Sequence, residues 1–200
     1  MKCIDFALSK MSGSAASIEM LTGVTVLPLN LSEDRVTKIA ENFLRRALRG
    51  NATEEHLEKT VGIYLKAQKE KSSIVAFKAM LRTILLLPEF YYRFEVGRNQ
   101  AEPYRVSDYE FATRLSYFLT GSTPDDELLD VSASGTLRET EVLDGQIRRL
   151  MSRSRRLSLS ESFAGQWIGF DTLLDSSAVD TQGVSTTARA QYDELLYFFD

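Results

Sequence analysis

Two adjacent carboxylates, Asp125 and Asp126, are the side chains of this 200-residue sequence whose types and spacing most readily suggest acid–base chemistry. A pair of carboxylates can act as general acid and general base when both face one substrate. Neighbouring positions on a helix, however, point about 100° apart. The preceding residues fit a helix start, with Thr123 as N-cap, Pro124 at the first helical position and both carboxylates in the first turn. The sequence therefore favours capping over catalysis for this pair.

Arg114 is a second candidate, because it lies on the flank of an apolar helix face in the same stretch, RLSYFLTGSTPDDELL. Its stem could lie along that apolar surface while its charged head stays in water. Alternatively, its guanidinium could form a buried ion pair with Glu95, Asp125 or Asp126, since arginine suits bidentate pairing with a carboxylate. The sequence leaves both interpretations open.

The segment FAGQWIG, residues 163–169, supplies two further candidates, Gln166 and Trp167. Phe163 and Trp167 are predicted to share one helix face, and Gln166 points elsewhere, toward solvent or a second element. Gly165 and Gly169 lie one turn apart, and each costs about 1 kcal/mol in a helix relative to alanine. We therefore expect another backbone to approach this helix closely.

Five arginines within RRLMSRSRR, residues 148–156, resemble a site for nucleic acid or phosphate. The run lacks interleaved aromatic residues, and the whole chain carries a net charge of −4. A solvated turn that partly compensates the carbonyls of a helix C-terminus explains these arginines better. We expect no nucleic-acid partner.

Cofactor chemistry is restricted by the single cysteine, Cys3, and the single histidine, His56. The chain cannot form an internal disulfide, a zinc site of the usual Cys/His type or a Cys-x-x-Cys-His haem attachment. We expect no cofactor and no metal in this chain, and an exposed helical position for His56. The N-terminus does not have the pattern of a signal peptide. No segment approaches the ~20 apolar residues of a membrane span.

Hydrophobic periodicity predicts an all-α fold, an irregular bundle of about seven to eight helices in two packed units. Apolar residues make up 44% of the chain, which suffices for a core. We expect a poorly ordered segment at 1–31, a three-helix unit at 32–96 and a helical domain at 103–200 that is truncated at its C-terminus. The last helix carries an apolar stripe, and we expect it to expose an apolar patch; the stripe consists of Tyr192, Leu195, Leu196 and Phe199.

Three strings carry a family resemblance: FYYRFE at 90–95, SDYEFATRLSYFLTGSTPDDELL at 107–129, and FAGQW at 163–167. They resemble large planctomycete-type proteins of unknown function that join a c-type cytochrome domain to several consecutive uncharacterised helical domains. Thr120 stands where that family usually has tryptophan. Residues about 32–96 are similar to one such domain, and residues about 103–200 to the first part of the next.

The resemblance implies an extracytoplasmic (periplasmic), electron-transfer-associated context, in which any haem c would belong to a neighbouring domain. We interpret the chain as a non-catalytic structural or interaction module. Its partners would be adjacent domains of a longer polypeptide or a companion protein. The alternative is part of a secreted enzyme domain acting on a polymer or small molecule, with a cleft near Arg114, Asp125, Asp126 and Gln166. Convergence of these four side chains on one pocket would favour the enzyme.

Overall fold

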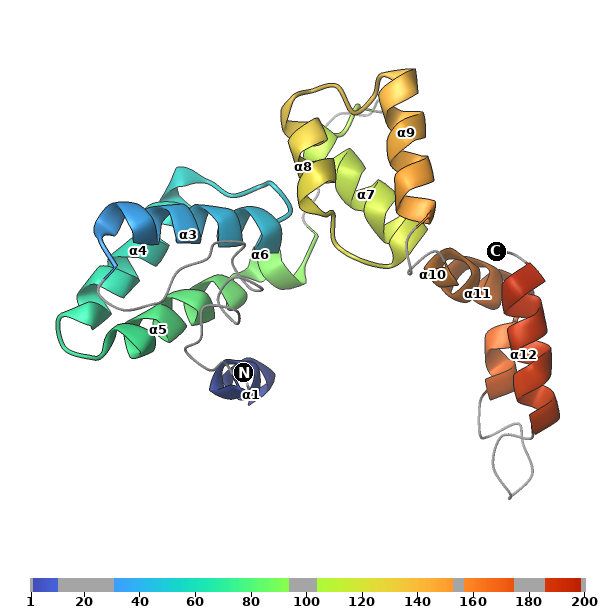
Figure 1. Ribbon diagram of the computed structural model, residues 1–200, viewed down its shortest axis with the longest axis horizontal. Helices are drawn as coiled ribbons and strands as arrows, with labels where there is room; N and C mark the ends of the chain where they lie inside the picture. The colour runs from blue at the N-terminus through green and yellow to red at the C-terminus, as the bar shows by residue number, and fades with distance from the viewer. Residues whose placement is uncertain (1, 11–30, 94–103, 153–156, 175–185, 199–200) are drawn as a thin grey trace. The chain divides into compact units, whose positions relative to one another are not determined.

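The computed structural model describes residues 2–10, 31–93, 104–152, 157–174 and 186–198, and within these ranges all regular structure is helical (Figure 1). The chain divides into two compact units, Met1–Tyr109 and Glu110–Asp200. The predicted all-α fold class is confirmed. The predicted boundary near residues 97–103 lies a few residues before this division and outside the described residues.

The first unit contains α1 (Lys2–Lys10), α3 (Glu33–Ala47), α4 (Glu54–Gln68), α5 (Ser73–Leu85) and α6 (Pro88–Tyr91). Helices α3, α4 and α5 pack together around one core (Figure 1). The buried positions of α5 recur with the helical period, and they are Ala76, Phe77, Met80, Leu81 and Ile84. Helix α5 ends just before Pro88, as the steric restriction before proline requires.

Helix α1 corrects the expectation that residues 1–31 are poorly ordered. Residues 2–10 form a helix, and Ile4 and Leu8 are buried in the core of the first unit. Their spacing of four residues places both on one face. Asp5 pairs with Arg82 of α5 at 3.1 Å. Residues 11–30, including the short extended segment expected near Val24, lie outside the described residues.

Arg49 ties the end of α3 to α6. Its backbone is left-handed, with φ of 55°, and its side chain is buried. The guanidinium donates to the carbonyls of Phe90 at 3.3 Å, of Tyr92 at 3.0 Å and of Glu89. These carbonyl groups belong to α6 and to the residue that follows it. A helix of four residues cannot supply backbone N–H donors for them.

His56 was expected at an exposed helical position, and the structure shows that it also takes part in capping α4. Its Nδ1 accepts the backbone N–H of Thr53 at 3.2 Å, while Thr53 Oγ1 accepts the backbone N–H of His56 at 3.3 Å. This reciprocal pair is a capping box at the start of α4, with histidine in the place usually taken by Glu or Gln. The Nε2 atom lies 3.9 Å from Glu89 Oε1.

The second unit begins with α7 (Asp108–Thr120), α8 (Asp126–Ala133) and α9 (Thr140–Met151). These helices and the loop after α8 enclose a small apolar core formed by Ala112, Leu119, Leu128, Leu137 and Leu150. Leu159 of the next segment packs against it. Thr120 is buried and donates its hydroxyl to the carbonyl of Ser116 at 2.8 Å.

The rest of the second unit contains α10 (Leu157–Leu159), the π-helix η1 (Ser160–Ala164), α11 (Gly165–Ile168), the 3₁₀-helix η2 (Phe170–Leu174) and α12 (Thr186–Phe198). Helix α12 packs against η2. Phe170 meets Tyr192 edge to face, with ring centroids 5.5 Å apart.

The stripe expected to be exposed on the last helix is partly packed. Leu196 is buried, and Tyr192 is half-buried against Phe170. The exposed aromatic residues of α12 are instead Tyr197 and Phe198. Phe199 lies outside the described residues.

Candidate functional site

Asp125 is the residue that caps α8. It has extended backbone, and its Oδ1 accepts the backbone N–H of Leu128 at 3.0 Å. The expected cap, Thr123, is exposed and lies two residues earlier; Pro124 directly precedes the cap, and Asp126 is the first helical residue. A carboxylate fills an N-cap well because it accepts an otherwise unsatisfied N–H near the positive end of the helix. Asp125 is thus the cap itself, and α8 begins two positions later than the sequence indicated.

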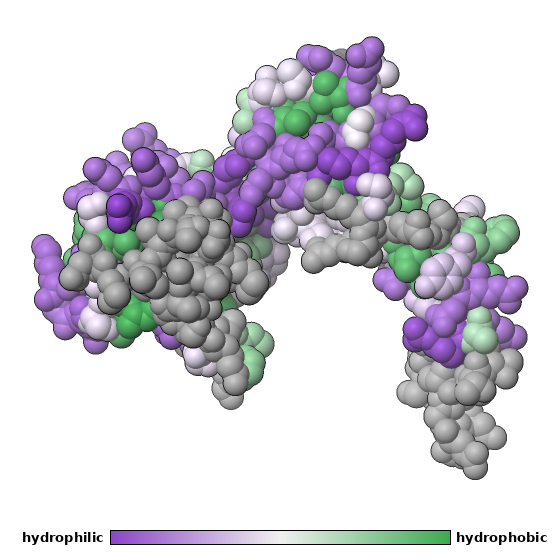
Figure 2. Space-filling view, viewed as in Figure 1, coloured by the Kyte–Doolittle hydropathy of each residue, from purple (hydrophilic) through white to green (hydrophobic). Residues whose placement is uncertain are grey.

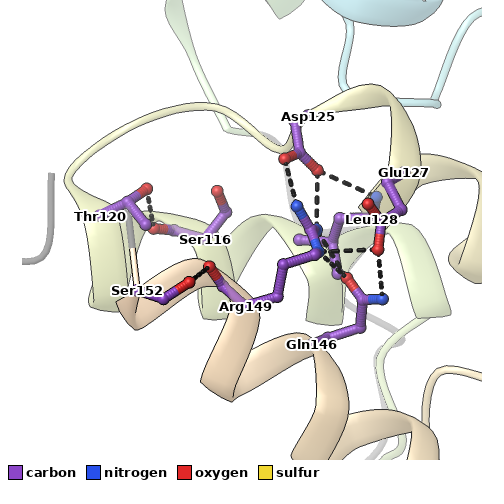
Figure 3. Close-up of polar contacts among 8 residues, drawn as sticks. All are labelled: Ser116, Thr120, Asp125, Glu127, Leu128, Gln146, Arg149 and Ser152. Atoms are coloured by element: carbon purple, nitrogen blue, oxygen red, sulfur yellow. Dashed lines mark hydrogen bonds and ion pairs between the residues drawn. The ribbon is translucent and has the colours of Figure 1, made fainter. Parts of the chain in front are cut away.

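The same carboxylate is held by Arg149 of α9 in a bidentate ion pair (Figure 3). Arg149 Nη1 lies 2.7 Å from Asp125 Oδ2, and Nη2 lies 3.0 Å from Oδ1. The Arg149 side chain is 19% exposed and that of Asp125 is 27% exposed. This half-buried pair therefore joins the start of α8 to the last turn of α9.

Glu127 and Gln146 complete the network around Arg149 (Figure 3). Glu127 Oε1 lies 2.8 Å from Arg149 Nε and accepts from Gln146 Nε2 at 3.0 Å. Gln146 Oε1 accepts from Arg149 Nη2 at 2.6 Å. Gln146 is buried, and both ends of its amide group are used.

Electrostatics favour the charged form of Arg149. The hydrogen bonds to Asp125 raise the pKa of the guanidinium most strongly, burial opposes this, and the charges of Asp125 and Glu127 raise it further. A guanidinium is already charged at any ordinary pH. The network therefore stabilises a fixed ion pair.

Chemically, this arrangement is a brace between two helices. Each oxygen of Asp125 accepts at least one hydrogen bond, and the nearby hydroxyls of Thr120 and Ser152 donate to the carbonyls of Ser116 and Arg149 (Figure 3). A general base must present a lone pair to its substrate. Asp125 directs its lone pairs to α8 and α9.

The other predicted site residues occupy different helices. Arg114 is exposed on α7, and the ion pairs described for Asp125 are made by Arg149. Gln166 and Trp167 are exposed on α11. Glu95 lies outside the described residues. The geometry thus brings Asp125 together with Glu127, Gln146 and Arg149, three residues absent from the predicted set.

Arg149 belongs to the arginine run that the sequence assigned to a solvated turn. Arg148 fits that assignment, since its side chain is 80% exposed and pairs with Asp144 one turn earlier. Arg149 does not, because it faces the core side of α9. Arg149 lies three residues after the buried Gln146, on the same side of α9, and this helical spacing is the signal that could have separated the two arginines.

The glycine-containing helix also differs from the expectation. A Cβ added to Gly165 would meet side-chain atoms of Asp171 and Phe170 and the carbonyl of Ser160 of the preceding helical turn, all at 3.7 Å, an ordinary contact distance. The predicted approach of a separate backbone is therefore wrong at Gly165. Gly169 ends α11 in the left-handed conformation, with φ of 83°, instead of lying inside a helix.

The helix face that Phe163 and Trp167 were predicted to share is exposed. Phe163 and Trp167 lie at the surface, whereas Ser160 and Ala164 are buried. The physical reason is the π-helix at Ser160–Ala164, which holds an extra residue in one turn and changes the register of the residues that follow.

Within the described ranges, no group of three or more His, Cys, Asp or Glu side chains is placed to hold a metal ion. No helix among these residues is long and apolar enough to cross a membrane. An open groove of about 340 Å³ lies between α1 and α5, lined by residues that include Asp5, Lys78 and Arg82 and none of the predicted site residues.

Comparison with known families gives two matches, to different parts of the chain. Residues 35–95 match the family described as "PSD5: Protein of unknown function (DUF1595)", and residues 106–197 match "PSD4: Protein of unknown function (DUF1592)". Neither a curated protein nor a solved structure matches the chain. The chain thus carries two consecutive uncharacterised helical domains.

Proposed function

We propose that this pair of consecutive uncharacterised domains is a non-catalytic structural or interaction module of a larger extracytoplasmic protein associated with a c-type cytochrome. The observation that carries the non-catalytic part is the engagement of Asp125. Its two oxygens accept the Leu128 N–H and two N–H groups of Arg149. The carboxylate that most readily suggests acid–base chemistry in the sequence therefore holds α8 against α9.

The energetics support a structural role for this network. Hydrogen bonds that involve a charged group contribute about 1.5–3 kcal/mol, more than neutral ones. Bidentate arginine–carboxylate pairs also fix geometry. The apolar core shared by α7, α8 and α9 is small. The ion pair and hydrogen bonds around Arg149, at the edge of this core, therefore add to the stability of the module.

The cellular context rests on sequence similarity alone. The strings at 90–95, 107–129 and 163–167 resemble proteins in which such domains follow a c-type cytochrome domain. In this proposal the chain binds no cofactor itself, haem c belongs to a neighbouring domain, and the partners are adjacent domains or a companion protein. Nucleic acid is not among them, given the net charge of −4.

The context is tested by reading the genomic DNA on both sides of the segment that encodes these residues. We expect a continuing frame, or an adjacent gene, that encodes Cys-x-x-Cys-His. A frame closed at both ends, with no haem-attachment sequence in a neighbouring gene, contradicts the cytochrome association. The purified chain should show no Soret band and no bound metal by elemental analysis, and one equivalent of either contradicts the cofactor part.

The non-catalytic part is tested with Asp125→Asn and Asp126→Asn. We expect Asp126→Asn to cost about 0.3–1 kcal/mol, as removal of a first-turn charge does. We expect Asp125→Asn to cost more, because it also removes the charge that Arg149 binds. A variant that keeps its stability and loses a measurable turnover would instead favour the secreted-enzyme alternative.

A further inference from the structure

Helix α5 carries a second stripe of side chains beside the stripe that faces its core. The positions of this second stripe recur at helical spacing, and they are Val75, Lys78, Ala79 and Arg82. We call these four residues the outer stripe. They line the open groove of about 340 Å³ together with residues of α1 (Figure 1). The outer stripe is only partly covered, since Val75 is 44% exposed and the other three residues are half-buried.

Helix α1 shows what kind of segment the outer stripe accepts. Ile4 and Leu8, one turn apart, are buried in the core of the first unit. Asp5, next to Ile4, pairs with Arg82 at 3.1 Å. The occupant is thus an amphipathic helix that brings apolar side chains and a carboxylate to the side that meets α5. This is the helix-in-groove manner of recognition, within one chain.

The match between α1 and the outer stripe is incomplete. Lys78 lines the same groove as Arg82, yet within the described residues it has no ion pair and no hydrogen bond. Ser9 stands one turn after Asp5 and also lines the groove, but its hydroxyl donates to the carbonyl of Phe6 at 2.7 Å. Helix α1 therefore brings one carboxylate to a groove that holds two cations.

Few contacts hold α1 in place. It has nine residues, fewer than the ~12–15 that make an isolated helix stable, so its helical form depends on docking. Of its described side chains two are buried, and its ion pair is 45% exposed at Asp5 and 42% exposed at Arg82. Its single ring, Phe6, is 65% exposed, and Figure 2 shows hydrophobic residues on the visible surface where α1 lies. Exchange of α1 for another helix would thus break few contacts.

The outer stripe belongs to the shared domain, and α1 does not. The family match of the first unit covers residues 35–95, which include α5 and exclude α1. Helix α5 carries two charged residues, both cationic, and the first unit has more basic than acidic residues although the whole chain has a net charge of −4. The charge of this surface therefore favours a partner that bears carboxylates.

We infer that the outer stripe binds an amphipathic helix of a partner protein, which replaces α1 and carries two acidic residues one turn apart. Apolar side chains of the partner helix take the places of Ile4 and Leu8, and its carboxylates pair with Arg82 and Lys78. Helix α1 is then an internal competitor that covers the site until the partner binds. This inference rests on the proposed interaction function and names its surface and the chemistry of its partner.

A labelled peptide tests binding to the 200-residue protein. The probe is an amphipathic Leu/Glu peptide of about 18 residues, long enough to form a helix. Its fluorescence anisotropy rises when it binds. A Leu/Lys peptide of the same pattern and a scrambled Leu/Glu peptide are the controls for charge and for helical pattern. We expect saturable binding of the patterned Leu/Glu peptide and binding of both controls that is weaker by about tenfold or more.

Lys78→Glu reverses the charge of the second cation in the groove. We expect it to weaken the patterned Leu/Glu peptide by about tenfold or more, about 1.4 kcal/mol. Lys59→Glu makes the same change at an exposed position of α4 and is the matched control. It should bind nearly as the parent does, because salt screens charges that lie apart. Circular dichroism establishes that both variants are folded, and Lys78→Met takes the place of Lys78→Glu if that variant is unfolded.

Displacement of α1 has its own measurement. Cys3 is the single cysteine of the chain and is exposed on α1, so a fluorophore attached there reports on the release of α1. We expect the anisotropy of this label to fall as unlabelled Leu/Glu peptide binds. Leu8→Ser weakens the internal competitor and should tighten peptide binding, since a larger fraction of the protein is then competent to bind. Phe6→Ser changes an exposed ring of the same helix and should bind as the parent does.

The inference is overturned if the patterned Leu/Glu peptide does not bind saturably, if Lys78→Glu binds it as the parent does, or if either control peptide binds equally well. A Cys3 label that does not respond to the peptide, or a Leu8→Ser variant that binds no more tightly, also overturns it, because α1 is then not the competitor. Binding of phosphatidylglycerol vesicles in place of the peptide overturns it in favour of a lipid surface. Activity that depends on Asp125 would contradict the proposed function and leave the peptide result standing. Failure of the peptide to bind would leave the proposed function standing.

Discussion

Replacing Arg149 with methionine tests whether the network around Asp125 is a structural brace. Methionine keeps much of the length of the arginine stem and removes all five N–H donors. The variant removes both hydrogen bonds from Arg149 to the Asp125 carboxylate, and it leaves Gln146 Oε1 without the donor at 2.6 Å. The loss therefore comes from one half-buried and one buried acceptor, and not from the ion pair alone.

The expected cost follows from burial. Exposed ion pairs contribute about 0–1 kcal/mol, and breaking a fully buried pair costs about 3–5 kcal/mol. With Arg149 19% exposed and Asp125 27% exposed, the site lies between these limits. We expect Arg149→Met to destabilise the second unit by about 2 kcal/mol. Arg149→Lys should lose about half as much, because lysine keeps the charge but cannot form the bidentate pair.

Hydrogen exchange is the suitable assay, because the chain has two units that can unfold separately. The amides of α8, including that of Leu128, should exchange about 30-fold faster in Arg149→Met, since about 1.4 kcal/mol corresponds to tenfold. The adjacent Arg148→Met is the matched control. Arg148 and its partner Asp144 are 80% and 62% exposed, so its replacement should change exchange little and only at low salt.

Equal effects of the Arg148 and Arg149 variants on α8 would refute the argument from burial. Unchanged exchange in Arg149→Met would show that the hydrogen bonds in Figure 3 do not hold α8. Either result would also remove the main support for a structural role of Asp125.

Three further predictions concern glycine positions, a buried tyrosine and the capping box. Gly169→Ala should destabilise the second unit by about 1 kcal/mol because its backbone is left-handed, whereas Gly165→Ala should be neutral or stabilising because the added methyl meets its neighbours at 3.7 Å; chemical unfolding of both variants measures this, and a larger loss from Gly165→Ala would contradict it. Burial raises the pKa of Tyr64 above 10.0, against weaker opposing contacts with Leu31 and Ser73, so the folded state favours the neutral phenol. That stability is present below pH 10.0 and is lost as the pH rises through the raised pKa; Tyr64→Phe should lack this alkaline loss, which unfolding at several pH values detects. His56→Ala should cost about 1 kcal/mol in thermal unfolding and His56→Gln much less, since glutamine can complete the box with Thr53, and equal losses would show that the box is not what stabilises α4.

The helices could be predicted because they depend on local periodicity. The buried positions of α3 and α5 recur at helical spacing, and turn residues such as Gly121 and Pro88 mark helix ends. Helix α1 was missed because a nine-residue helix with two buried side chains, Ile4 and Leu8, gives a weak periodic signal. Its stability comes from contact with α5, which is a tertiary effect.

Of the ion pair between Asp125 and Arg149, only the role of Asp125 at a helix start could be predicted from the sequence. A carboxylate directly after Pro124 indicates a helix start. Capping joins residues only three apart in the sequence, so a short local pattern is enough to predict it. Arg149 is 24 residues away from Asp125, and their contact depends on how α9 packs on α8. Nothing in the local pattern of an arginine run separates Arg149 from Arg148 except the phase of the apolar residues around it.

The exposure of Trp167 could not be predicted for a different reason. Sequence patterns assume 3.6 residues per turn, and on that assumption Phe163 and Trp167 share a face with Ala164, which is buried. A π turn breaks the assumption without any diagnostic residue. Gln166 is exposed, which agrees with the first of the two alternatives, solvent or a second element, that the sequence left open.

The π turn at Ser160–Ala164 also has a consequence for how this domain can change over evolutionary time. It accommodates one more residue than an α-helical turn, so deleting a single residue there would restore a regular helix. The register of the residues beyond the deletion would then change relative to what precedes it. Such a deletion would turn Phe163 and Trp167 relative to Leu159 without altering any side chain. A single insertion or deletion could thus change whether these rings are exposed. Relatives that differ by one residue at this point should differ in whether this surface is apolar.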